Sequence, residues 1–218
     1  MTVTNHAVET PINGLYASPP APLPFAPSLR IRSFLLRRDA GNVLVYGGPT
    51  VEAAAFAEVG GIARAYLNHG HEAAFGEDLP GVPLFVHAAD RDAVAGKRKI
   101  RGTFSHRLVL DDDLEIIPTP GHTPGATAYL WDNGAQRLLF TGDTISLRDG
   151  EWVAAVLDSS DREAYVESLE LIRQLDYNVL VPWVATADGP YYALTDGADA
   201  RRRVDAILER IRRREDRR

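Results

Sequence analysis

Two short stretches of this chain restrict its fold more than any others. Residues 118–125 read Pro-Thr-Pro-Gly-His-Thr-Pro-Gly, and the apolar run 137–140 ends in Thr-Gly-Asp at residues 141–143. Prolines and glycines on both sides of His122 restrict φ and permit tight bends, so this imidazole lies in a rigid loop. Asp143 follows an apolar run that is typical of a buried strand. The pattern therefore places an imidazole and a carboxylate where loops leave strands.

Another pair of imidazoles lies upstream, in the sequence Asn-His-Gly-His at residues 68–71, after the expected strand 62–67. In an extended segment His69 and His71 project to the same side, because side chains alternate along an extended chain. A single cation could then bind both rings.

Three imidazole nitrogens and one carboxylate oxygen are suited to a transition metal. As a set they form a closed or nearly closed tetrahedral zinc site. If one histidine swings out, the remainder is the two-histidine, one-carboxylate face used by non-haem iron. The sequence thus predicts one divalent metal, zinc by preference and iron as the alternative, with four ligands: His69, His71, His122 and Asp143.

The bulk composition narrows the class of protein. The chain has 218 residues, enough for one large domain with a full core, and it has no cysteine, so disulfides and thiolate ligands are excluded. The first ten residues lack the pattern of a signal peptide, and no apolar run is long enough for a membrane helix. We expect a cytoplasmic protein with no membrane partner.

Charge is unevenly distributed along the chain. The net charge is −6, but residues 199–218 carry nine arginines against five acidic residues, so the rest of the chain is strongly acidic. Apolar residues at helical spacing predict that one face of this segment packs on the body while the arginines face water. An acidic body disfavours nucleic acid as a substrate, and the basic helix is a candidate contact for a homo-oligomer.

The hydropathy pattern predicts a single domain over residues 1–218. Residues 1–29 are rich in proline and are expected to be an irregular lead-in, and residues 198–218 to be the basic helix. Helices are also expected at 50–59, 89–95 and 161–175, and strands at 30–36, 42–46, 62–67, 83–86, 108–110, 114–117, 126–131, 137–140 and 179–181. This order suggests two sheets with helices outside.

At these motifs the chain resembles the metallo-β-lactamase-fold superfamily, which includes glyoxalase II-like hydrolases. The resemblance extends over most of the chain, from about Arg30 to Val184, and is densest in the two stretches around His122 and Asp143. It implies an α/β fold, a four-layer αβ/βα sandwich, with the metal site at one edge between the sheets.

The chain departs from the family pattern in a consistent way. In the usual His-x-His-x-Asp-His motif, Ala73 and Ala74 stand in place of the Asp and the last His, and Val184 stands in place of the final histidine. The family's Ile-Asp-x-Gly reads Val-Tyr-Gly-Gly at residues 45–48. The resemblance implies that the ligands of the first metal are kept and those belonging only to the second are lost. One ion, not two, is therefore expected.

The resulting hypothesis is a mononuclear metal-dependent hydrolase of a small ester, thioester or amide-type substrate. Glu72, next to the missing aspartate, is the candidate general base. Trp183 is expected either to pack in the core or to wall the pocket. Two alternatives remain open: a catalytically impaired metal- or ligand-binding protein of the same fold, and a non-haem iron dioxygenase.

Overall fold

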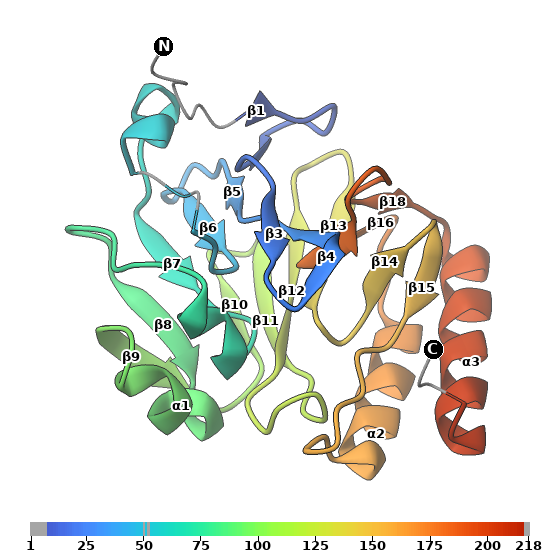
Figure 1. The fold of residues 1–218 in the computed structure, drawn as a ribbon. Coiled ribbons are helices and arrows are strands. Elements are labelled where there is room, and N and C mark those ends of the chain that lie inside the picture. The colour runs from blue at the N-terminus through green and yellow to red at the C-terminus, as the bar shows by residue number, and fades with distance from the viewer. Residues whose placement is uncertain (1–7, 50, 52, 216–218) are drawn as a thin grey trace.

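The structure, a computed structural model, describes residues 8–49, 51 and 53–215, and Figure 1 shows how their elements are arranged. Its largest sheet has seven strands in the order β1-β2-β5-β6-β7-β8-β9. The pairs from β6 to β9 are parallel and the other pairs are antiparallel. The strands are β1 (Val8–Glu9), β2 (Leu15–Ala17), β5 (Phe34–Leu36), β6 (Val43–Val45), β7 (Arg64–Tyr66), β8 (Leu84–His87) and β9 (Ile100–Phe104).

A second sheet has six strands in the order β10-β11-β12-β13-β16-β18, antiparallel except for the parallel pair β13 and β16. Its strands are β10 (Leu108–Leu110), β11 (Leu114–Pro118), β12 (Thr127–Asp132), β13 (Arg137–Gly142), β16 (Val179–Pro182) and β18 (Ala193–Leu194). A third, smaller sheet has the order β15-β14-β17-β4-β3. It contains β3 (Ala21–Leu23), β4 (Ala26–Ile31), β14 (Ser146–Arg148), β15 (Glu151–Val153) and β17 (Val184–Thr186).

The helices lie on the two outer sides of the sheets (Figure 1), with α2 and α3 side by side on one of them. They are α1 (Arg91–Ala95), α2 (Arg162–Gln174) and α3 (Gly197–Arg213), with 3-10 turns η1 (Ala53–Val59), η2 (Gly70–Ala74) and η3 (Ala88–Asp90). Asp161 and Asp196 accept hydrogen bonds from the first backbone N–H groups of α2 and α3 and so cap both helices. No helix in the described part of the chain is both long and apolar enough to cross a bilayer.

Alternation along the strands separates three apolar cores. Leu138 and Phe140 of β13 pack between the two large sheets, whereas Leu139 between them packs beneath α2 and α3. In the same way Val43 and Val45 face the space between the sheets, and Leu44 faces η1 and α1. The result is the four-layer αβ/βα sandwich that the sequence predicts.

The proline-rich lead-in differs from its prediction. Within the described residues it forms β1, β2 and β3 and begins β4, so the prediction of an irregular segment is wrong there. The reason is that Pro22 lies on β3, which is an edge strand. An edge strand tolerates proline because the missing N–H can point away from the neighbouring strand. The expected helix at 50–59 is described only from Ala53 as a 3-10 turn, and residues 50 and 52 lie outside the described part. Beyond this segment, five more strands (β9, β14, β15, β17 and β18) were not predicted, since most are two or three residues long.

The docking of α3 can be tested by truncation. Leu208 is 2% exposed and packs in the core beneath α2 and α3, so Leu208→Ala should lower the free energy of unfolding by about 2–5 kcal/mol. Glu209→Ala, on the exposed side of the helix, should change it by less than about 0.5 kcal/mol. Urea unfolding of both variants measures this, and equal effects would contradict the amphipathic placement of the helix.

Candidate metal centre

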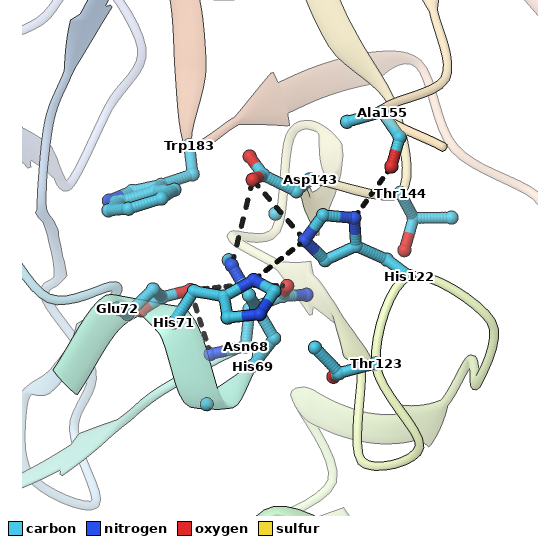
Figure 2. A network of polar contacts seen from close by, with 12 residues as sticks. Asn68, His69, His71, Glu72, His122, Thr123, Asp143, Thr144, Ala155 and Trp183 are labelled. Carbon is cyan, nitrogen blue, oxygen red and sulfur yellow. Dashed lines mark hydrogen bonds and ion pairs between the residues drawn. The ribbon is translucent and has the colours of Figure 1, made fainter. Parts of the chain in front are cut away.

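Three histidines converge where loops leave the strands (Figure 2). His69 follows β7, His71 lies on η2, and His122 lies in the loop between β11 and β12. One ring nitrogen of each lies within 4.8 Å of the corresponding nitrogens of the other two. Among the described residues this is the single cluster of potential metal ligands of this size. The structure thus brings together residues that are up to 53 positions apart in sequence.

The two nearby histidines meet by a different route from the one predicted. His69 is extended, with φ −155° and ψ 166°, but η2 begins directly after it and contains His71. The expectation of a continuous extended segment is therefore wrong. The turn still brings the two rings together, with 5.2 Å between their centroids, in an edge-to-face arrangement.

Hydrogen bonds at the outer nitrogens fix the orientation of two rings. His122 Nδ1 lies 2.6 Å from the carbonyl oxygen of Ala155, which can only accept, so Nδ1 carries the proton. His69 Nδ1 lies 2.9 Å from Asn68 Oδ1, and the amide nitrogen of Asn68 donates to the carbonyl of Thr127. The Nε2 lone pairs of His69 and His122 are thereby left to face the centre, as in histidines that bind metals.

Three distances between candidate ligand atoms are close to those in the ligand shell of a small tetrahedral ion. Asp143 Oδ2 lies 3.6 Å from His69 Nε2 and 3.5 Å from His122 Nε2, and His71 Nδ1 lies 3.1 Å from His122 Nε2. Ligands bound to zinc at 2.0–2.1 Å in a tetrahedron are about 3.3 Å apart. Moreover, His69 Nε2 and Asp143 Oδ1 are buried and have no hydrogen-bond partner within the described structure. Buried orphan atoms of this kind indicate a missing partner.

Burial also sets the protonation state of the imidazoles. It lowers the pKa of His69 to about 3, outweighing the nearby Asp143 carboxylate, which raises it. Burial likewise lowers the pKa of His71 and His122. All three rings are therefore neutral at pH 7, which is the form that binds a metal.

Glu72 is placed differently from the role predicted for it. Its buried carboxylate accepts hydrogen bonds from the backbone N–H groups of Gly47, at 2.7 Å, and Asn68, at 3.1 Å. Its Oε1 also lies 3.2 Å from His69 Nδ1, the ring nitrogen turned away from Asp143. Burial raises the pKa of Glu72 to about 8. The carboxylate supports the back of the His69 ring, so this placement does not suit the predicted general base.

Apolar side chains occupy the positions that the family pattern gives to the second metal. Ala73 is buried in the core beneath η1, and Val184 is buried in β17. The Trp183 indole N–H donates to the carbonyl of Gly47 at 2.8 Å, and its ring contacts the edge of His69 at 5.3 Å between centroids. Trp183 therefore both packs against the centre and walls the pocket.

The centre opens into a wide cleft of about 890 Å³. His71, His122 and Asp143 line it, whereas His69 is buried behind them. Most of the wall is apolar, and two cationic side chains, Lys97 and Arg148, also border the cleft. The principal apolar residues are Leu23, Phe25, Leu29, Phe75, Leu157 and Trp183.

Several residues at the site were not predicted as part of it. Asn68 precedes His69 in the sequence, but an asparagine next to a metal ligand does not by itself predict a hydrogen bond to that ligand. Asp90 follows β8 and contacts both ligand-bearing loops. Its position after a parallel strand, at the edge where His69 follows β7, was the available signal. The carbonyl of Ala155 leaves no trace in the sequence.

Residues 53–182 match the family model described as the metallo-beta-lactamase superfamily. The chain belongs to this superfamily. Among curated proteins, none matches the sequence. Solved structures of the superfamily share its fold. A metallo-beta-lactamase from Pontibacter korlensis has a TM-score of 0.69 at 16% identity, over 94% of this chain and 99% of that one. One from Hirschia baltica has a TM-score of 0.67 at 15% identity, over 94% and 97%.

A more distant structure with a stated activity also matches. AidC, described as a dizinc quorum-quenching lactonase in complex with a product, has a TM-score of 0.54 at 14% identity, over 77% of this chain and 76% of that one. At such identities the likeness to these metallo-β-lactamase-fold proteins concerns the fold alone.

The ring orientations predict specific tautomers. In metal-free protein at pH 7, His69 and His122 should both be neutral with the proton on Nδ1, because each Nδ1 faces an oxygen acceptor. Long-range ¹H–¹⁵N correlation spectra distinguish the two tautomers. A proton on Nε2 of either ring would contradict the arrangement.

Proposed function

We propose that the protein is a mononuclear metal-dependent hydrolase of a small ester, thioester or amide-type substrate. The observation that carries this proposal is the cluster of three neutral imidazoles that each turn one nitrogen toward the same point at the base of a wide cleft. A bound divalent ion would supply a Lewis acid that polarises a carbonyl and lowers the pKa of water. We assign it to zinc, with His69, His71, His122 and Asp143 as the groups around it.

The residues where the family pattern places a second metal support a single ion in this protein. Ala73 and Val184 offer no ligand atom, and the one polar atom of the Trp183 side chain is a donor already bonded to Gly47. Nothing in this part of the described structure replaces the carboxylate and imidazole that the family pattern has there. A single ion would therefore have to bind the substrate and activate the water molecule.

Asp143 supplies the polar chemistry that Glu72 does not. Its Oδ2 faces His69 and His122, while its Oδ1 has no hydrogen-bond partner within the described structure. Because Oδ1 is buried and the side chain as a whole is 15% exposed, Oδ2 is the oxygen that would face a bound cation and accept a proton from a water molecule in the cleft. Because Asp143 lines the cleft, that water would be accessible to substrate. We therefore transfer the proposed role of proton acceptor from Glu72 to Asp143.

The cleft walls favour a substrate with an apolar group beside its scissile bond. Phe25 is 77% exposed at the tip of the β3–β4 hairpin, and Leu157 is 42% exposed; both line the cleft. A lactone is a cyclic ester, so the lactonase activity stated for AidC falls within the proposed class.

One alternative function has an observation in its favour. Ala73, Ala74 and Val184 stand where the family pattern has metal ligands. A binding protein of this fold, which needs no catalysis, would tolerate such replacements. Such a protein would use the same cleft and the same histidines without turnover. Metal content and hydrolysis, measured together, separate the two: metal binding without hydrolysis of any ester, thioester or amide tested favours the binding protein. Iron content with oxygen uptake would instead indicate the dioxygenase.

The proposed metal centre can be tested by its zinc content. Protein purified without chelators should contain about one zinc per chain by elemental analysis. His122→Ala should remove both the metal and the hydrolysis of p-nitrophenyl esters, since it deletes one of three nitrogens. The matched control is His106→Ala, an exposed histidine outside the cluster and the cleft, which should retain both. Two ions per chain, or hydrolysis that survives complete metal removal, would refute the proposal.

The exposed apolar side chain of Phe25 at the edge of the cleft gives a prediction about substrate binding. Phe25→Ala should leave folding unchanged, because the side chain is largely exposed. Against p-nitrophenyl esters with longer acyl chains it should raise KM roughly fivefold, equivalent to about 1 kcal/mol of apolar contact. KM for p-nitrophenyl acetate should hardly change. Val109→Ala serves as the control, since Val109 is 57% exposed and does not line the cleft. An identical effect on short and long esters would contradict a substrate contact at Phe25.

A further inference from the structure

Asp90 is a buried carboxylate beside the centre whose role lies outside the chemistry above. It ends η3 and occupies the N-cap position of α1, yet its side chain makes no capping hydrogen bond to that helix. The residue is only 3% exposed. A buried aspartate is costly unless its oxygens accept hydrogen bonds, so the partners of this side chain indicate what it does.

All of its partners lie in the two loops that carry the histidines. Asp90 Oδ2 accepts from the backbone N–H of Gly70 at 2.6 Å and from the hydroxyl of Thr123 at 2.7 Å. Asp90 Oδ1 accepts from the backbone N–H of Gly125 at 2.8 Å. Gly70 stands between His69 and His71, and Thr123 follows His122 directly. One carboxylate therefore connects the loops within one residue of every imidazole ligand.

Steric contacts show that both loops lie directly against this side chain. A Cβ atom on Gly125 would come within 2.6 Å of Asp90 Cγ, and one on Gly70 within 3.4 Å of Asp90 Oδ2. Contacts under 3.0 Å do not occur for real side chains, so the Gly125 position requires glycine. The close approach is what allows the two backbone N–H groups to reach a single carboxylate.

Other hydrogen bonds at the centre act at different points. Asn68 and Thr127 tie the same loops through main-chain and side-chain bonds, but Thr127 is five residues beyond His122, at the start of β12. The bonds to Asn68 and Ala155 orient individual rings. Asp90 alone among these groups contacts the chain next to the ligands in both loops. Its charge also raises the pKa of each of the three rings, against the larger effect of burial, which lowers it.

We propose that Asp90 is a positioning residue of the metal centre: by holding Gly70, Thr123 and Gly125 on one carboxylate, it sets the separation of the His71 and His122 nitrogens and thereby the affinity for the ion. This inference rests on the metal site proposed above. It assigns no contact between Asp90 and the ion or the substrate.

The test uses the full chain and zinc itself. Asp90→Asn keeps the shape of the side chain but turns one acceptor into a donor, which then faces the N–H of either Gly70 or Gly125. Zinc affinity, measured by competition with a chromophoric chelator, should fall about 10- to 100-fold, as for other groups that orient metal ligands. The absorption spectrum of the cobalt-substituted protein should change with it, because the ligand geometry relaxes. In metal-free protein, the Gly70 and Gly125 amides should lose protection from hydrogen exchange.

Two matched comparisons separate positioning from general stability. Thr123→Val removes only the hydroxyl and should weaken zinc binding, whereas Thr123→Ser keeps the hydroxyl and should bind as the wild type does. This pair decides the question if Asp90→Asn fails to fold. Asp113→Asn weakens the hydrogen bonds from Arg38 and Trp131, at the ends of β11 and β12 opposite to the His122 loop, and should lower stability without lowering zinc affinity.

The outcomes are distinct. Wild-type zinc affinity and an unchanged cobalt spectrum in folded Asp90→Asn would overturn the positioning role and leave the proposed function intact. An equal loss of affinity in Asp113→Asn would also overturn it, since the effect would then be one of stability. Absence of zinc binding by the wild-type protein would overturn the proposed function, and the positioning role with it, whatever the variants do.

Discussion

Three imidazoles and a carboxylate gathered around one point are not a favourable arrangement on their own. His71 Nδ1 lies 3.1 Å from His122 Nε2, to which it can donate a hydrogen bond, whereas His69 Nε2 is buried without a hydrogen-bond partner in the described structure. Such crowding persists only where the surrounding structure holds the rings in place. Much of the structure around the centre serves this requirement. The side chains of Asn68 and Glu72 lie behind the His69 ring, where they contact its outer nitrogen and form hydrogen bonds with the backbone.

The support extends into the packed layers. The carbonyl of Ala155 orients His122, and the N–H of Ala155 donates to the hydroxyl of Tyr165 at 3.1 Å. Tyr165 is fully buried on α2, in the core beneath the two long helices. The same hydroxyl donates to the carbonyl of Thr144, one residue past Asp143. A helix that touches neither ion nor substrate thus determines where an imidazole and a carboxylate lie, so its packing and the geometry of the centre are coupled.

Sequence reasoning succeeded where the signal was local and repeated. The apolar run of β13 and the helical spacing of apolar residues in α3 can be recognised in the sequence because each reflects the local surroundings of its own residues, and the layered fold follows from such elements. The convergence of His69 and His122 was inferred from their loops and from a family resemblance. The role of Glu72 was misjudged because adjacency in sequence says nothing of which side of a turn a carboxylate occupies; η2 turns it behind His69. Asp90 was overlooked since two of its three partners are backbone N–H groups, which every residue but proline possesses.

The surroundings of Ala73 and Val184 determine how a second metal site could be built in this chain. Ala73 is 3% exposed within an apolar core, so an aspartate restored there alone would bury a charge with no partner. A histidine restored at residue 184 would have to coexist with the Trp183 indole, which is hydrogen-bonded to Gly47 and packed on His69. Either substitution alone would therefore be unfavourable. Building a second metal site into this chain would need several changes together, so the existing histidine cluster is the easier starting point for engineering a new activity.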